Sequence, residues 1–129
     1  MTWTIETDTE NELIVVSVCE EISVDEDLYL EVADKVIIYN RTLKFNILFI
    51  VLGPRMDLSE NEIVNLVHRT CYKYKEEGME EVKVAGVVSR SNHAGWKFVV
   101  LINRMLGRHA SLFLTEEKAI EWLVDPHEF

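Results

Sequence analysis

The stretch FNILFIVLGP, at positions 45–54, is the most strand-like part of this chain of 129 residues. Aliphatic and aromatic side chains fill nearly all of its first eight positions, and such a composition favours a β-strand. Gly53 and Pro54 end the run, because proline lacks an amide donor and restricts the residue before it. The segment therefore predicts a strand over 45–52.

Further strands are predicted on both sides of this segment. WTIET (3–7) and ELIVVSV (12–18) are rich in β-branched residues, and the polar stretch between them predicts a β-hairpin. The second of these strands is apolar at nearly every position, so helices are expected to cover both of its faces. VKVAGVVS (82–89) and HASLFL (109–114) predict two more strands.

The first helix is predicted to begin at Ser23, because Ser23 and Glu26 have the spacing of a capping box. Hydrophobic periodicity carries this helix to about residue 39. Its buried stripe is predicted to consist of Leu28, Val32, Val36 and Tyr39.

Three more helices follow. A second capping box, Ser59 with Glu62, predicts a helix that ends at Gly78. Helices are also predicted over 94–106 and 116–123, the last with acidic residues in its first turn.

The resulting order, ββαβαβαβα, predicts an α/β fold. We expect a single domain over 1–129 with a mixed, mostly parallel sheet of about five strands, an N-terminal antiparallel hairpin and about four flanking helices. In such sheets, ligands and partners bind at the loops that follow the carboxyl ends of the parallel strands.

The charge balance is strongly acidic, with 23 Asp and Glu residues against 13 Lys and Arg residues and a net charge of -10. Nucleic acid is therefore not an expected partner, because its binding depends on neutralising phosphates with basic side chains. An anionic membrane surface is disfavoured for the same reason.

The chain is expected to be cytoplasmic. Its longest apolar runs fall far short of the ~20 residues that cross a bilayer, so no membrane insertion is predicted. The first twelve residues, MTWTIETDTENE, do not have the basic and apolar regions of a secretory signal. Cys19 and Cys71 lack CxxC companions and do not indicate a disulfide framework.

The order of elements and three segments of the chain resemble a known family. The strand VKVAGVVS, the helix with Trp96, and the segment SLFLTEEKAIEWL (111–123) together resemble the SpoIIAA-like group of the STAS (sulphate transporter and anti-sigma-factor antagonist) superfamily, whose fold is STAS/Sec14-like. The sharpest piece is Phe113 leading into a last helix with Ala119, Trp122 and Leu123. The resemblance covers nearly the whole chain, and it implies a non-enzymatic regulatory module that binds a protein partner.

The resemblance also points to Ser59. The best-studied relatives carry Asp-Ser-Ser-Gly after the third strand, with one serine phosphorylated by a partner kinase. Asp57 and Ser59 match that motif, whereas Leu58 and Glu60 replace its first serine and its glycine. Because Ser59 also serves as an N-cap, and Glu60 and Glu62 would repel a phosphate, a structural cap is the favoured interpretation over a phosphorylation switch.

Two loops are expected to meet at one end of the sheet. They follow the strands at 45–52 and 82–89, and two helix N-termini with arginines nearby are suited to an anion or a partner's carboxylate. The alternative is an ordinary cluster of turn residues. The candidate polar residues are Arg55, Asp57, Ser59, Ser89, Arg90, Ser91, Asn92 and His93.

Catalytic and metal-binding patterns are weak. His68 and Cys71 share a helix face, but two ligands do not make a zinc site, so neither a metal nor another cofactor is expected. No GxSxG motif occurs, and the remaining catalytic pairing would be His93 with Ser59 or Asp57. The chain is therefore predicted not to be an enzyme.

The predicted helix over 94–106 is apolar on two sides. One stripe consists of Trp96, Val99, Val100 and Asn103. The nearly opposite stripe consists of Phe98, Leu101, Ile102 and Met105. Since a surface helix needs only one apolar stripe, we expect burial all round by the fold, another subunit or an apolar ligand.

Two functions follow from this helix. The first is a regulatory interaction with an unidentified protein partner, or self-association as a homodimer, through the polar loops and Trp96, Phe98, Leu101, Ile102 and Met105. The second is a carrier or sensor of a small apolar or lipid-like ligand held between the 94–106 helix and the sheet.

Overall fold

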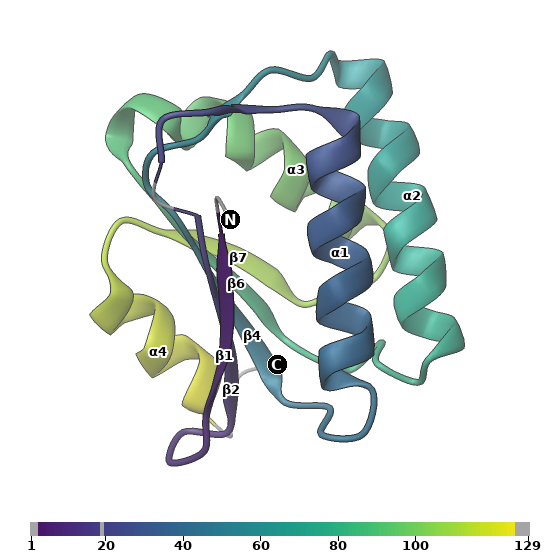
Figure 1. Cartoon of the computed structure of the whole chain (residues 1–129), viewed down its shortest axis with the longest axis vertical. Coiled ribbons are helices and arrows are strands. Elements are labelled where there is room, and N and C mark those ends of the chain that lie inside the picture. Colours follow the sequence, from purple (N-terminus) through teal and green to yellow (C-terminus); the bar gives the residue numbers. More distant parts are fainter. Residues whose placement is uncertain (1–2, 19, 126–129) are drawn as a thin grey trace.

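The computed structural model describes residues 3–18 and 20–125 (Figure 1). Its helices are α1 (Glu26–Asn40), α2 (Glu60–Glu76), α3 (His93–Met105), α4 (Glu116–Val124) and a short 3-10 turn, η1 (Arg90–Asn92). Its strands are β1 (Thr4–Asp8), β2 (Leu13–Ser17), β3 (Ser23–Val24), β4 (Asn46–Val51), β5 (Arg55–Met56), β6 (Val84–Val88) and β7 (Ala110–Phe113).

The main sheet has five strands in the order β1-β2-β4-β6-β7. β1 and β2 pair antiparallel, whereas the other neighbouring strands pair parallel. This confirms the predicted α/β fold, its mixed sheet and its N-terminal hairpin. The short parallel pair β3–β5 was not predicted from the sequence, because two-residue strands carry no periodicity.

Helices cover both faces of the sheet, with α1, α2 and α3 on one side and α4 on the other (Figure 1). Alternating residues of each strand serve the two faces: Ile14 and Ile47 pack with α1, whereas Leu13 and Leu48 pack with Leu123 of α4. The expectation that β2 is covered on both faces is therefore confirmed.

The N-cap of the first helix lies two residues later than expected. Asp25, not Ser23, accepts the backbone N–H of Leu28, at 2.8 Å, while Ser23 lies in β3 and pairs with Arg55. The capping box predicted for Ser23 and Glu26 is therefore wrong, because β3 takes Ser23 into a strand.

The predicted burial of Tyr39 is also wrong. The buried positions of α1 are Ala33, Val36, Ile37 and Asn40, and Tyr39 lies off that stripe with 41% of its surface exposed. Its hydroxyl accepts a hydrogen bond from Thr7 at 3.0 Å instead.

The capping box of α2 is confirmed in full. The Ser59 hydroxyl accepts the Glu62 backbone N–H at 3.2 Å, and the Glu62 carboxylate accepts the Ser59 backbone N–H at 3.0 Å. The predicted helices over 94–106 and 116–123 correspond to α3 and α4.

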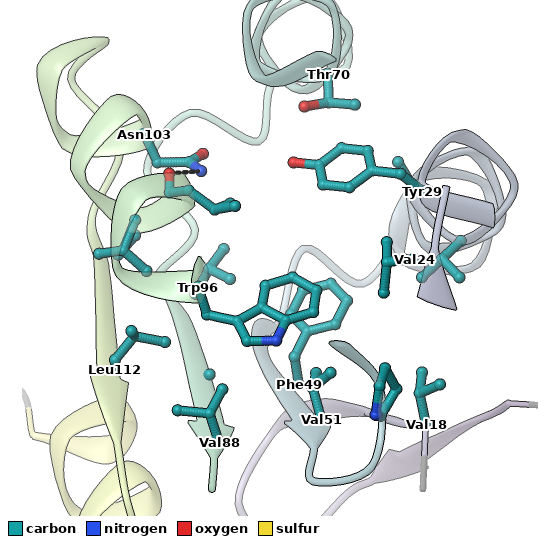
Figure 2. A pocket seen from close by; sticks show the side chains of 18 of the residues that line it. Val18, Val24, Tyr29, Phe49, Val51, Thr70, Val88, Trp96, Asn103 and Leu112 are labelled. Carbon is teal, nitrogen blue, oxygen red and sulfur yellow. Dashed lines mark hydrogen bonds between the residues drawn. The ribbon is translucent and has the colours of Figure 1, made fainter. Parts of the chain in front are cut away.

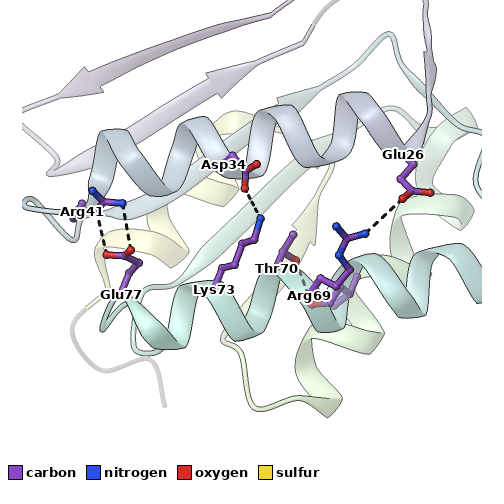
Figure 3. A network of polar contacts seen from close by, with 8 residues as sticks. Glu26, Asp34, Arg41, Arg69, Thr70, Lys73 and Glu77 are labelled. Carbon is purple, nitrogen blue, oxygen red and sulfur yellow. Dashed lines mark hydrogen bonds and ion pairs between the residues drawn. The ribbon is translucent and has the colours of Figure 1, made fainter.

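α1 and α2 lie side by side and are joined by three exposed ion pairs (Figure 3). Exposed pairs contribute about 0–1 kcal/mol each, so these pairs align the two helices more than they stabilise the fold. The pairs are Arg41–Glu77 at 3.1 Å, Lys73–Asp34 at 2.8 Å and Arg69–Glu26 at 3.5 Å.

Among residues 3–18 and 20–125, no helix combines the length and the apolar character that a bilayer crossing requires.

Asp25→Ala is expected to lower the free energy of unfolding by about 1 kcal/mol, because the variant loses the acceptor for the first turn of α1. Ser23→Ala, the matched control, is expected to change it by less than about 0.5 kcal/mol. Urea denaturation measures both variants, and a larger loss at Ser23 than at Asp25 would contradict the observed cap.

Candidate functional site

An apolar cavity of about 150 Å³ lies between the sheet and the helices α1, α2 and α3 (Figure 2). Its floor includes Val18, Val51 and Val88, at or just beyond the carboxyl ends of β2, β4 and β6. Trp96 and Asn103 of α3 line it from one side. The cavity therefore occupies the region where parallel α/β sheets bind ligands.

Short side chains leave this space open. Along β6, the residues Val84, Gly86 and Val88 face the cavity, whereas Ala85 and Val87 face α4. Gly86 has no side chain to fill the space, and a Cβ there would lie 3.0 Å from Leu112 Cδ2. The opposite face of the sheet is closed by the larger side chains of α4.

One stripe of α3 lines the cavity. It consists of Trp96, Val99, Val100 and Asn103, the first of the two apolar stripes noted in the sequence. The expected place of an apolar ligand, between this helix and the sheet, is thus a hollow in the structure.

The second stripe of α3 is only partly covered. Ile102 is buried and Phe98 is half-buried against α2, but Leu101 and Met105 are 49% and 73% exposed. Of the three expected coverings, complete burial of α3 by the rest of the fold is wrong, because α2 covers only one side of this stripe. Burial by another subunit or by an apolar ligand stays a prediction.

Most polar groups in the cavity wall are already engaged. Asn103 donates to the Val99 carbonyl at 2.8 Å and accepts from the Cys71 thiol at 3.4 Å. The Tyr29 hydroxyl points toward Thr70 (Figure 2), and burial raises the pKa of Tyr29 far above its ordinary value while a hydrogen bond with Thr70 opposes the rise. Tyr29 is therefore a neutral hydroxyl at physiological pH.

Two buried nitrogens of the wall, Trp96 Nε1 and Arg108 Nε, have no hydrogen-bond partner among the described residues. Arg108 is only 7% exposed, and its guanidinium carbon lies 4.1 Å from the centre of the Tyr74 ring. No ion pair joins Arg108 to a carboxylate within residues 3–18 and 20–125. The wall therefore holds a positive charge without an anionic partner.

The end of α3 places Arg108 inside. Gly107 adopts a left-handed backbone conformation, φ 86°, and the Arg108 backbone N–H returns to the Asn103 carbonyl at 2.9 Å. Burial raises the pKa of the Tyr74 hydroxyl and of the Cys71 thiol, and the nearby guanidinium opposes both shifts. Sequence reasoning missed Arg108, since a cation after a helix C-terminus is usually solvated and favoured by the helix dipole.

The two polar loops meet, as expected. The Asn92 amide donates to the Pro54 carbonyl at 2.9 Å, and the Ser89 and Ser91 hydroxyls lie 3.1 Å apart. Arg55, Asp57, Ser59, Arg90 and Ser91 are exposed, whereas Ser89, Asn92 and His93 are half-buried.

None of these eight loop residues lines the cavity, which lies beneath the loops. No hydrogen bond or ion pair joins His93 to Ser59 or Asp57 in the part of the chain that the structure describes. The Ser59 backbone N–H lowers the pKa of the Glu62 carboxyl, so Ser59 acts in the helix cap.

The Cys71 thiol and the His68 imidazole, considered as metal ligands, have different surroundings. Cys71 bonds Asn103, His68 is exposed, and Cys19 lies outside the described residues. Across residues 3–18 and 20–125, no three His, Cys, Asp or Glu side chains converge as metal ligands would.

Comparisons of the chain with family models, curated proteins and solved structures found no match.

Arg108→Met is expected to leave the free energy of unfolding unchanged or to raise it by about 1 kcal/mol, because it replaces an unpaired buried charge with an apolar side chain of similar length. Arg108→Lys, the control, keeps the charge and is expected to be less stable than Arg108→Met. Urea denaturation compares the variants, and a loss above about 2 kcal/mol in Arg108→Met would show that the guanidinium stabilises the fold.

Proposed function

We propose that this chain is a non-enzymatic, cytoplasmic module, resembling SpoIIAA-like STAS proteins, that carries or senses a small apolar ligand in the cavity beside α3. The cavity carries the proposal. Protein interiors are normally packed without voids larger than a water molecule.

A small molecule that fills this space in the folded state alone would stabilise the fold. The position supports the same conclusion: Val18, Val51 and Val88 bring the cavity to the carboxyl ends of three neighbouring strands. Its wall is mostly apolar with a few polar groups, as is typical of small-molecule sites.

A regulatory interaction with a protein partner is the second candidate, favoured by the exposure of Leu101 and Met105. These residues belong to the same helix whose other stripe lines the cavity. In this candidate, α3 and the loops that carry Arg55 and Arg90 form the surface that contacts the partner or a second copy of the chain.

Benzene is a suitable first probe, because an engineered apolar cavity of the same volume binds it. A saturating concentration is expected to raise the Tm of the wild-type chain by about 3 °C or more. Val88→Phe, which places a ring in the cavity, is expected to raise the Tm without ligand and to abolish the response to benzene.

Leu112→Phe, on β7, is a second cavity-filling variant in case Val88→Phe distorts the sheet. An equal benzene response in the wild type and in both filled variants would place binding elsewhere, and no response in the wild type would remove the proposal.

Native mass spectrometry of the chain purified from its own cells tests the two candidates against each other. The carrier or sensor function predicts a small-molecule adduct that is lost on denaturation. A bare monomer or dimer without an adduct would favour the protein-interaction candidate, in which Leu101 and Met105 are the residues to substitute.

A further inference from the structure

We propose that the cavity binds a small monocarboxylate, with its carboxylate on the guanidinium of Arg108 and its apolar body between the sheet and α3. This inference rests on the proposed ligand-binding function and names the chemical class of the ligand.

The charge of the wall is the first argument. Arg108 is only 7% exposed to solvent, and no carboxylate among the described residues forms an ion pair with it. Burying an unpaired charge costs several kcal/mol. The Tyr74 ring, with its centre 4.1 Å from the guanidinium carbon, attracts the cation but leaves its charge unneutralised.

One negative charge neutralises one guanidinium. A monocarboxylate leaves the site neutral, whereas a phosphate dianion would leave an uncompensated negative charge in an apolar cavity. An amine would add a second positive charge and is excluded on the same ground. A carboxylate oxygen also accepts from Arg108 Nε, the guanidinium donor that lacks a partner among the described residues.

The hydrogen-bonding groups left unused in the cavity wall also point to this class of ligand. The two unpaired nitrogens, Arg108 Nε and Trp96 Nε1, are both donors. The ligand must therefore supply acceptors. Because Trp96 lies in the first turn of α3 and Arg108 follows its last turn, the two donors mark opposite ends of this helix, and a small ligand bound to Arg108 leaves the Trp96 donor unused.

The volume limits the apolar body. A cavity of about 150 Å³ accommodates a molecule such as benzene, so the apolar body has roughly six non-hydrogen atoms, as in an aromatic or short branched-chain carboxylic acid. A long acyl chain exceeds this volume, which narrows the lipid-like alternative to small acids.

Benzoate and nitrobenzene make a matched pair of probes, because they share shape and planarity and differ in charge. Isothermal titration at pH 7 is expected to show that Arg108→Met weakens benzoate binding about 10- to 100-fold, the range for losing hydrogen bonds to a charged group. Nitrobenzene affinity is expected to change by less than about 3-fold in the same variant. Arg108→Lys keeps the charge and is expected to retain part of the benzoate affinity.

The outcomes separate the two proposals. Equal benzoate affinities in the wild type and Arg108→Met, with nitrobenzene bound by both, would overturn the carboxylate inference and leave the cavity as a site for neutral molecules. Failure of the wild type to bind benzoate, nitrobenzene or benzene would overturn the proposed function as well.

Val88→Phe controls for location, since filling the cavity is expected to abolish binding of both probes. Thermal melting verifies that each variant is folded. If Arg108→Met does not fold, the ratio of benzoate to nitrobenzene affinity in Arg108→Lys replaces it, and an unchanged ratio there would count against the inference.

Discussion

The fold depends on covering both faces of a largely parallel sheet whose strands carry apolar side chains in both directions. On one face, Ala119 and Leu123 of α4 pack onto Leu48 and Val87 in a buried cluster. On the other face, α1 packs on the sheet near its hairpin, where Ile14 and Val36 belong to one core cluster. The helices α2 and α3 pack on each other in a separate cluster. Between these contacts the sheet is left uncovered, and the cavity is the result.

The lining shows how this space is maintained. Some positions that face the cavity carry short side chains, such as Ala33 on α1, Gly86 on β6 and Ala110 on β7. The same elements carry Ile37, Val87 and Phe113 on positions that pack in the two cores. Longer side chains, such as Phe49, Trp96 and Leu112, also line the cavity, so the short residues account for only part of the hollow.

The strands and helices were predictable because their signals are local. Strand composition, helical periodicity and the Ser59–Glu62 capping box each lie within one segment, and each is found in the structure. The cap of α1 was assigned wrongly because the pairing of Ser23 with Arg55 joins residues far apart in the chain. A strand partner that is distant in the sequence cannot be recognised from the local sequence pattern.

The same distinction applies to the site. The cavity-facing stripe of α3 was visible in the sequence as an apolar helix face, but the volume opposite it depends on side chains from three helices and several strands. The polar loops were chosen because they follow parallel strands. They do meet, through Asn92 and the Pro54 carbonyl, yet the cavity lies below them.

Arg108 shows most clearly why sequence reasoning stopped short. An arginine after a helix and a glycine is ordinarily a solvated cation. Here the left-handed Gly107 turns the chain back, and the side chain is buried over Tyr74. Buried charge without a partner lowers stability, and such exceptions to the rules of packing are expected at functional sites. Since α3 begins near the Trp96 donor, ends just before Arg108 and presents Leu101 and Met105 to solvent, a ligand held by Arg108 would bear on the same helix that exposes these two apolar side chains. Carrier and regulatory module therefore need not be rival descriptions, because a single helix connects the cavity with the surface.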